Sequence, residues 1–326
     1  MLTKHEEYER IRKEVIDWLP SKIIDSHVHT PLILNTKPVR VFSRGLYNIY
    51  FKDKLKVTSE NFQDILPGKD LSIIGIPPPY KESVPKIINA MAVKEPNPTL
   101  LINDEIKNLQ PILKDNVIGI KSHWKIENKK GNFDNLISEE KLEFLEKNKL
   151  CLLIEMSDPP NNFDKLKEVD QRYKVKIILP HIGFSHEPMF IPRKDFEDSF
   201  NKHRKDYDVF RKLADTKNIF LDISMKTDYD LMATCLKHMG EDRLLFGTDF
   251  PFGLTMKIKE DRVAIGRERM FMQLRDILLG REFDERWRYF YNIYLLVWTL
   301  KKVCDRLDTE KEKVMYNNAK KIMRKQ

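Results

Sequence analysis

The chain is poor in several features that would place it in other protein classes. Its 326 residues hold three cysteines, which are far apart and form no CxxC pair. Such spacing excludes a disulfide framework and is typical of a protein in a reducing compartment. No GxGxxG turn is present, so the sequence offers no support for a dinucleotide-binding fold.

Long apolar runs are also missing. The longest extends from Tyr289 to Leu300, contains an asparagine and is too short to span a bilayer. The first residues, 1–12, are charged and lack the apolar stretch of a signal peptide. We therefore expect a cytoplasmic protein that does not bind membranes.

Charge is spread along the chain rather than concentrated. Lysine and arginine outnumber aspartate and glutamate by 58 to 50, which gives a net charge of +8. Only the C-terminal stretch 320–325 is strongly basic, and such a stretch is typical of a solvated helix face. Without a nucleic-acid-binding motif, the charge favours a small anionic substrate over a nucleic acid.

Short apolar runs alternate with helix-like segments through most of the chain. The expected strands are Lys22–His27, Leu71–Ile76, Thr99–Ile102, Val117–Lys121, Leu150–Glu155, Lys174–Leu179, Asn218–Ile223 and Arg243–Thr248. The expected helices are Lys81–Val93, Asp104–Leu113, Ser138–Lys147, Phe163–Arg172, Tyr207–Asp215 and Asp228–His238. This alternation predicts an α/β protein with a parallel sheet, which over about 250 residues fits one (β/α)8 TIM barrel. An open doubly wound sheet is the alternative.

Two segments are longer than a minimal barrel needs. Residues 31–70 form the first connection and include Arg44. Residues 250–312 follow the eighth strand, and we expect them to contain a long helical insertion at about 254–312. The aromatic stretch 287–298 predicts a helix that either packs on the barrel or forms a homodimer interface.

Polar residues end several of the expected strands. His27 and His29 end the first strand, two residues apart, so they project from the same face. The other strand-end residues are Lys121, His123, Glu155, His181 and Asp249. Active sites of TIM barrels lie at this end of the strands, so we expect these side chains to converge.

Imidazole and carboxylate together are the ligands of a transition metal. Two imidazoles on one strand make half of such a site, and later strand ends supply candidates for the rest. This donor set suits zinc, manganese or iron(II), and an aspartate at the last strand can both bind metal and transfer a proton. The alternatives remain that Glu155 caps a following helix, that Lys121 is a salt-bridged lysine and that His123 is a hydrogen-bonded loop residue.

These motifs resemble the amidohydrolase superfamily, in the amidohydrolase-related branch that includes aminocarboxymuconate-semialdehyde decarboxylase. The resemblance extends from Ile24 to about Ile322. Its markers are Ile24-Asp25-Ser26-His27-Val28-His29, Gly119-Ile120-Lys121-Ser122-His123, Leu179-Pro180-His181-Ile182-Gly183, Phe246-Gly247-Thr248-Asp249-Phe250-Pro251-Phe252 and Asn317-Asn318-Ala319-Lys320-Lys321-Ile322.

The resemblance implies a divalent metal at the strand ends of a (β/α)8 barrel. It implies His27 and His29 as ligands, Asp249 as ligand and proton shuttle, and His181 as a ligand or an acid–base group. Many relatives carry a histidine on the fifth strand, where this chain has Glu155. A carboxylate ligand there would favour manganese or magnesium over zinc. Zinc remains the first candidate, with manganese or iron as alternatives.

Three functions compete. The leading hypothesis is a metal-dependent hydrolase in which Asp249 and His181 are catalytic and activated water attacks an amide, ester or lactone carbonyl. Lys121, His123 and Arg44 are the candidate contacts to the substrate. The second hypothesis is a non-oxidative decarboxylase of an aromatic or enoic acid at the same site. The third is a metal-free barrel that acts as a binding protein.

Overall fold

The computed structural model describes nine stretches of the chain. They are residues 4–29, 66–76, 99–103, 117–123, 137–156, 162–183, 207–249, 255–258 and 288–323. The expected helices Lys81–Val93 and Asp104–Leu113 lie outside these residues, as does Arg44 of the first long connection.

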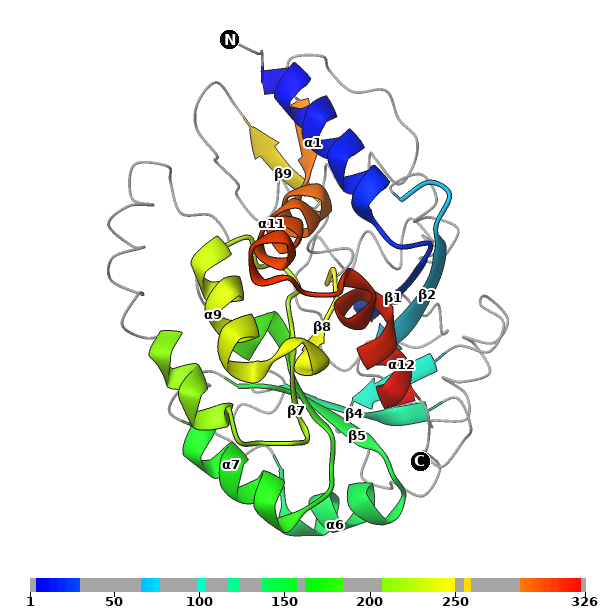
Figure 1. Cartoon of the computed structure of the whole chain (residues 1–326). Helices are drawn as coiled ribbons and strands as arrows, with labels where there is room; N and C mark the ends of the chain where they lie inside the picture. Colours follow the sequence, from blue (N-terminus) through cyan, green and yellow to red (C-terminus); the bar gives the residue numbers. More distant parts are fainter. Residues whose placement is uncertain are drawn as a thin grey trace, which may run out of the picture.

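One parallel sheet organises the chain (Figure 1). Its eight strands follow one another in sequence order, and each overlaps a strand predicted from the sequence. They are β1 (Lys22–His29), β2 (Asp70–Ile76), β3 (Thr99–Asn103), β4 (Val117–His123), β5 (Cys151–Glu155), β6 (Ile177–Leu179), β7 (Ile219–Asp222) and β8 (Leu244–Leu245). Sequence order and parallel pairing are what repeated strand–helix units produce.

Hydrogen bonds also link the first strand to the chain around the last one. The regular strand ladder runs from β1 to β8. Beyond it, the backbone N–H of Ser26 donates to the carbonyl of Phe246 at 2.9 Å, and that of Asp249 donates to the carbonyl of His27 at 2.9 Å. The Ser26 hydroxyl donates to the same Phe246 carbonyl at 2.8 Å. The C-terminal end of β1 therefore lies beside the segment that follows β8.

Three of the expected helices, α6 (Glu139–Lys147), α7 (Phe163–Arg172) and α9 (Tyr229–Met239), follow strands. Further helices lie near both ends of the chain, and they are α1 (Lys4–Trp18), α11 (Asn292–Leu307) and α12 (Asn318–Met323). Ser138 and Asp228 cap α6 and α9, because their side chains accept from the backbone N–H groups of Lys141 and Leu231. The predicted helix 207–215 is instead a run of 3-10 turns from Tyr207 to Leu213.

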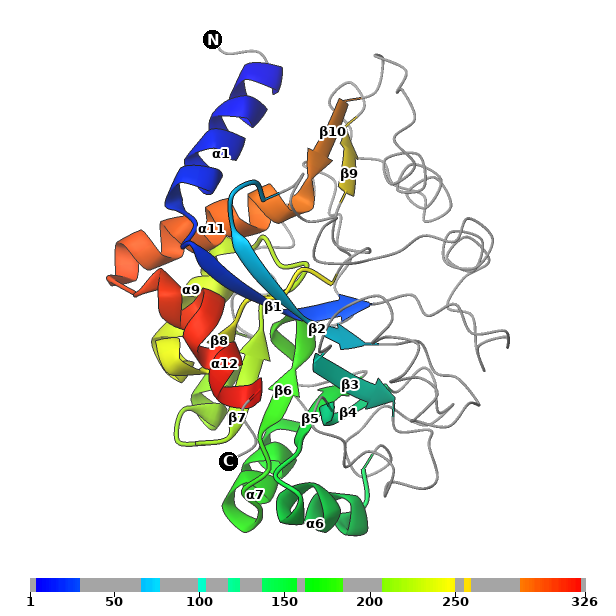
Figure 2. The same ribbon diagram turned by 90° about the vertical axis from the view of Figure 1, so that its right-hand side faces the viewer.

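The segment after β8 differs from the expected helical insertion. Its described part begins with a two-stranded antiparallel ribbon, β9 (Thr255–Ile258) and β10 (Arg288–Tyr291), which lies away from the eight-stranded sheet (Figure 2). The prediction of a helix over 287–298 is therefore wrong in its first half, and α11 begins at Asn292. Aromatic residues favour paired strands, and here the partner strand lies far away in the sequence.

Apolar side chains fill both faces of the sheet. The larger cluster packs between strands and helices and includes Val28, Phe163, Phe210 and Tyr294. A smaller cluster on the other face contains residues from β1, β2, β4, β5, β6, β7 and β8, together with Ala319 and Ile322 of α12. Burial on both faces explains why the strands are almost continuously apolar in sequence.

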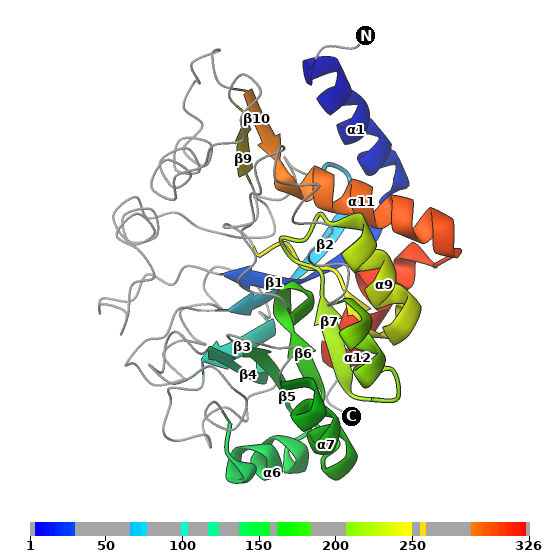
Figure 3. The same cartoon turned by 90° about the vertical axis from the view of Figure 1, so that its left-hand side faces the viewer.

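The N-terminal helix α1 packs against α11 (Figure 3). Glu14 of α1 accepts hydrogen bonds from Lys302 at 3.3 Å and from the indole N–H of Trp298 at 3.4 Å. Among the described residues, no helix is long and apolar enough to cross a membrane.

Candidate metal centre

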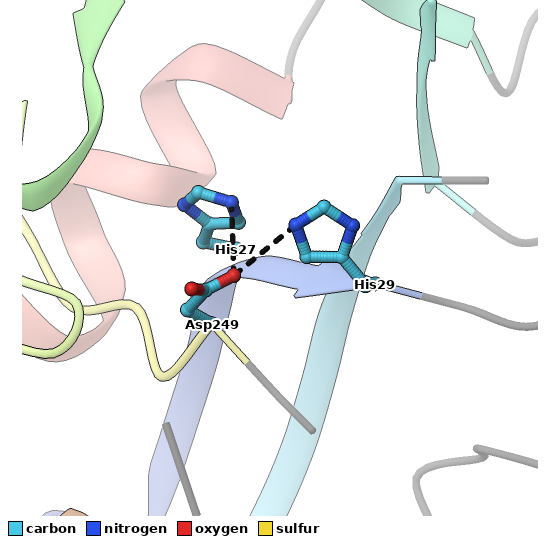
Figure 4. Close-up of side chains that lie close together, drawn as sticks. All are labelled: His27, His29 and Asp249. Carbon is cyan, nitrogen blue, oxygen red and sulfur yellow. Dashed lines mark ion pairs between the residues drawn. The ribbon is translucent and has the colours of Figure 1, made fainter. Parts of the chain in front are cut away.

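Two histidines and an aspartate meet where β1 ends and β8 has just ended (Figure 4). The potential ligand atoms of His27, His29 and Asp249 all lie within 4.8 Å of one another. Asp249 Oδ1 is 3.4 Å from His27 Nε2 and 3.1 Å from His29 Nε2. His27 is fully buried, whereas the His29 side chain is 15 % exposed, so the cluster meets solvent on the His29 side.

The local backbone conformation directs these three side chains toward one another. The register of β1 on β2 shifts between Asp25 and Val28, which is the sign of a β-bulge next to His27. Asp249 has a φ of 56°, in the left-handed region. Aspartate tolerates this region better than most residues, and the turn brings its side chain back toward β1.

A carboxylate from β7 orients His27. Asp222 Oδ2 lies 2.6 Å from His27 Nδ1, and both side chains are fully buried. A carboxylate can only accept, so Nδ1 carries the hydrogen and Nε2 faces Asp249. Partners of this kind hold metal-binding histidines in position.

His181 lies beside His27 and is held by the segment that follows β7. The two imidazole centroids are 5.3 Å apart. His181 Nδ1 lies 3.2 Å from the carbonyl oxygen of Ser224 and 3.0 Å from its hydroxyl. The backbone of His181 is left-handed, with a φ of 56°. Its Nδ1 is therefore engaged by Ser224, which leaves Nε2 for a ligand or a proton.

Lys121 of β4 points into the same cluster. Its Nζ is 3.1 Å from His27 Nε2, 3.4 Å from His29 Nε2 and 3.8 Å from Glu155 Oε2. Only 2 % of the Lys121 side chain is exposed. A buried ammonium is costly unless carboxylates or other acceptors surround it, and here they do.

A third buried aspartate, Asp25, supports the cluster through its hydrogen bonds. Asp25 accepts hydrogen bonds from the Thr248 hydroxyl at 2.6 Å, the Thr248 backbone N–H at 3.0 Å and the His27 backbone N–H at 3.1 Å. These contacts tie β1 to the residue just before Asp249. Burial raises the pKa of Asp25 to about 7.

Burial and neighbouring charges shift the pKa values of the other buried groups. Burial raises the pKa of Asp249, although His27, His181 and Lys121 oppose the rise. Burial lowers the pKa of His181. Burial would also raise the pKa of Asp222, but the contact with His27 outweighs it and the pKa of Asp222 is lowered. Asp222 therefore stays charged beside His27.

The structure places the predicted site residues at different distances from the cluster. His27, His29 and Asp249 form the one group of the described residues whose ligand atoms are mutually close, and this group does not include Glu155 or His181. Lys121 and Glu155 pair with each other beside it. His123 ends β4, but its side chain lies outside the described residues, as does Arg44.

Sequence reasoning missed the residues that hold the cluster together. Asp222, Ser224, Asp25 and Thr248 were not among the predicted site residues. Asp222 could have been found, because it is the penultimate residue of the predicted strand 218–223 and lies close to the strand end, where Glu155 also lies on the fifth strand. Ser224 could not, since it acts from a turn whose path the sequence pattern does not reveal.

The family of this chain follows from a match over its C-terminal half. The amidohydrolase family model matches residues 161–325, just over half of the 326 residues. The chain belongs to the amidohydrolase family. This membership implies a TIM barrel, in keeping with the eight-stranded parallel sheet. A comparison with curated protein sequences finds no match.

Solved structures of distant amidohydrolases share the fold. An amidohydrolase from Bifidobacterium longum subsp. infantis is 12 % identical, with a TM-score of 0.55 over 93 % of this chain and 99 % of that one. A zinc-bound amidohydrolase from Burkholderia multivorans is 11 % identical, with a TM-score of 0.55 over 92 % and 98 %. The 5-carboxyvanillate decarboxylase of Sphingomonas paucimobilis is 12 % identical, with a TM-score of 0.52 over 94 % and 100 %.

Proposed function

We propose that this amidohydrolase is a metal-dependent hydrolase that cleaves an amide, ester or lactone of a small anionic substrate. The observation that carries the proposal is the convergence of His27 Nε2, His29 Nε2 and Asp249 Oδ1 within 4.8 Å. Membership of a metal-dependent family supports it.

The donor set fits a divalent transition metal. Two imidazole nitrogens and one carboxylate oxygen suit zinc, iron(II) or manganese and leave further positions open. We favour zinc, and the zinc-bound relative from Burkholderia multivorans supports this choice. A metal bound here would supply a Lewis acid for the attacking water and the substrate carbonyl.

Asp249 and His181 are the proposed acid–base groups. One Asp249 oxygen, Oδ1, faces the two imidazoles, so Oδ2 is the atom that accepts the proton of the attacking water and later passes it to the leaving group. His181 presents Nε2 because Ser224 engages Nδ1. Its pKa, lowered by burial, keeps the imidazole neutral near pH 7, so that Nε2 binds the substrate or relays a proton.

Substrate binding would draw on the positive charge of Lys121. Among the described residues, Lys121 supplies a buried cation beside the cluster. Its positive charge suits a substrate carboxylate. His123 and Arg44 remain predicted substrate contacts. The ligand roles predicted for Glu155 and His181 also remain predictions, and we favour Glu155 as the partner of Lys121 instead.

A non-oxidative decarboxylase is the second candidate. The buried Lys121 ammonium would clamp the carboxylate that is lost, and Asp249, whose pKa is raised by burial, would protonate the carbanion. A decarboxylase with the same fold, the 5-carboxyvanillate enzyme, supports this alternative. Loss of carbon dioxide without consumption of water distinguishes it from hydrolysis.

The first experiment measures metal content together with turnover. Purified protein, a His27→Ala/His29→Ala variant and a His238→Ala control on α9 are analysed by inductively coupled plasma mass spectrometry. We expect about one metal per chain in the wild type and the control, and none in the double variant. A panel of lactones, amides and aromatic acids then separates hydrolysis from carbon dioxide release. Failure of all three proteins to bind zinc, manganese or iron would contradict both enzyme proposals and favour a binding protein.

A further inference from the structure

The buried ammonium of Lys121 lies between the two histidines of the cluster. Its Nζ is 3.1 Å from His27 Nε2 and 3.4 Å from His29 Nε2. We infer that Lys121 is a built-in counter-charge at the metal position, and that a divalent cation binds by displacing it toward Glu155. The inference rests on the proposed metal-dependent function.

The surroundings of Lys121 Nζ are those of a cation. His27 donates through Nδ1 to Asp222, so its Nε2 presents a lone pair. An ammonium can only donate, so Nε2 of His27 accepts from Lys121, and Nε2 of His29 accepts from it in the tautomer that carries the hydrogen on Nδ1. Asp249 Oδ1 lies 3.4 Å and 3.1 Å from the same two nitrogens. The lone pair of His27 Nε2 and the nearby Asp249 carboxylate favour a positive charge at this position, and the Lys121 ammonium supplies one beside the two imidazoles.

The ammonium and a metal cannot use the same lone pairs. A metal binds histidine nitrogen at about 2.0–2.1 Å along the lone pair that an N–H donor would otherwise use. Two cations within a few ångströms in a buried site also repel each other strongly. Metal binding at His27 and His29 therefore requires Lys121 to withdraw.

Glu155 provides the place to which Lys121 withdraws. Its Oε2 is 3.8 Å from Lys121 Nζ, and it lies on β5, the strand that pairs with β4. A short movement of the flexible lysine side chain would bring the two into close contact. Lys121 Nζ then lies beside the metal rather than at the metal position. From there it can bind an anionic substrate. Glu155 thus becomes a positioning residue instead of a ligand.

Three roles of Lys121 can be distinguished, because each predicts a different metal affinity for a variant in which an uncharged residue replaces the lysine. If Lys121 competes with the metal, its removal makes metal binding tighter. If Lys121 were a metal ligand after covalent modification, its removal would abolish or weaken metal binding. If Lys121 contacted only the substrate, its removal would leave the metal affinity unchanged.

The experiment compares Lys121→Met with Lys237→Met. Lys237 is exposed on α9, so its variant loses the same charge away from the cluster. Zinc and manganese dissociation constants of chelator-stripped protein are measured by competition with a chromogenic chelator, and melting temperatures are measured with and without metal. We expect Lys121→Met to bind metal about tenfold tighter or more, while its metal-free form melts at a lower temperature. Lys237→Met should match the wild type in both measurements.

Glu155→Gln provides the second comparison. It should weaken metal binding in the wild type. In the Lys121→Met background it should have no effect, because there the Lys121 ammonium that Glu155 would accept is absent. Equal weakening in both backgrounds would show that Glu155 is a ligand and would overturn the inference. If Lys121→Met does not fold, Lys121→Gln replaces it, since the amide keeps an N–H donor and removes the charge.

The outcomes separate this inference from the proposed function. A wild type that binds no metal contradicts the proposed function and the inference with it. A wild type that binds metal, beside a Lys121→Met variant that binds it equally or less tightly, overturns the inference alone. Intact mass spectrometry of the wild type adds a direct check, because a covalent modification of Lys121 would also contradict it.

Discussion

Asp222 Oδ2 lies 2.6 Å from Nδ1 of His27, and neither side chain is exposed to solvent. The contact joins β7 to β1, two strands that are not neighbours in the regular ladder. It fixes which nitrogen of His27 faces Asp249 and His29. A residue that touches no proposed substrate position therefore sets the geometry of the candidate metal centre.

Asp222→Asn should weaken metal binding. The amide keeps the size of the side chain but loses the negative charge that holds His27, so we expect a loss of about 10- to 100-fold in metal affinity. Chelator competition measures it. Asp215→Asn, at an exposed carboxylate, is the control and should not change the affinity. An Asp222→Asn protein with wild-type affinity would show that this contact does not orient His27.

Gly247→Ala should disturb the same region by crowding. A Cβ at this position would lie 2.5 Å from Asp222 Oδ1 and 3.0 Å from His27 Cβ, and both neighbours are fixed by their mutual contact. We expect a loss of about 1–3 kcal/mol in the free energy of unfolding, together with weaker metal binding. Denaturant unfolding and metal titration measure the two effects.

Gly240→Ala is the matched control for this crowding. Gly240 has a φ of +77° but nothing lies within 4 Å of an added Cβ, so its variant carries backbone strain without a clash. It should lower stability and leave metal affinity unchanged. If both variants behave alike, crowding at Asp222 is not the cause.

Thr248→Val should loosen the junction between β1 and the end of β8. The variant removes the hydroxyl that donates to Asp25 at 2.6 Å and leaves a buried carboxylate oxygen without that donor. We expect about 1–3 kcal/mol of destabilisation in urea unfolding. Thr248→Ser retains the hydroxyl and should recover most of the loss. Equal losses in both variants would assign the effect to packing rather than to the hydrogen bond.

Glu14 should make the docking of α1 dependent on pH. Burial would raise its pKa, but Lys302 and Trp298 outweigh this effect, so the pKa lies below its ordinary value of 4.5. A lowered pKa stabilises the fold above pH 4.5 and loses this contribution as the pH falls through the pKa of the folded state. Glu14→Gln should therefore cost about 0.5 kcal/mol at pH 7 and nothing at strongly acidic pH.

Urea unfolding of this variant at several pH values measures the difference. Glu140→Gln, at an exposed residue of α6, is the control and should show no such trend. A cost that stays constant as the pH falls would mean that packing of α1, rather than the charge of Glu14, accounts for it.

The order of the strands and the three central residues of the candidate site could be predicted from the sequence. His27 and His29 could be predicted because apolar strands ending in polar residues are a local pattern, and the carboxyl ends of parallel strands meet at one edge. The same pattern pointed to Asp249 at the last strand. These predictions needed only strand direction and side-chain alternation.

Longer-range geometry could not be predicted in this way. The ribbon of β9 and β10 depends on pairing between segments about 30 residues apart, so the aromatic pattern of 287–298 alone favoured a helix. The left-handed backbone of His181 and Asp249 depends on the surrounding contacts. The pairing of Glu155 with Lys121 likewise requires knowing where the lysine side chain points.

The link between the first and last strands has a consequence for how the protein matures in the cell. His27 and Thr248 both bond to Asp25, and the Thr248 contact spans 223 residues of sequence. While the chain is being synthesised, the two histidines leave the ribosome long before Asp249 does. A nascent chain shorter than about 250 residues therefore cannot complete the three-residue cluster, so any metal that the cluster binds can be acquired only after the eighth strand has been synthesised.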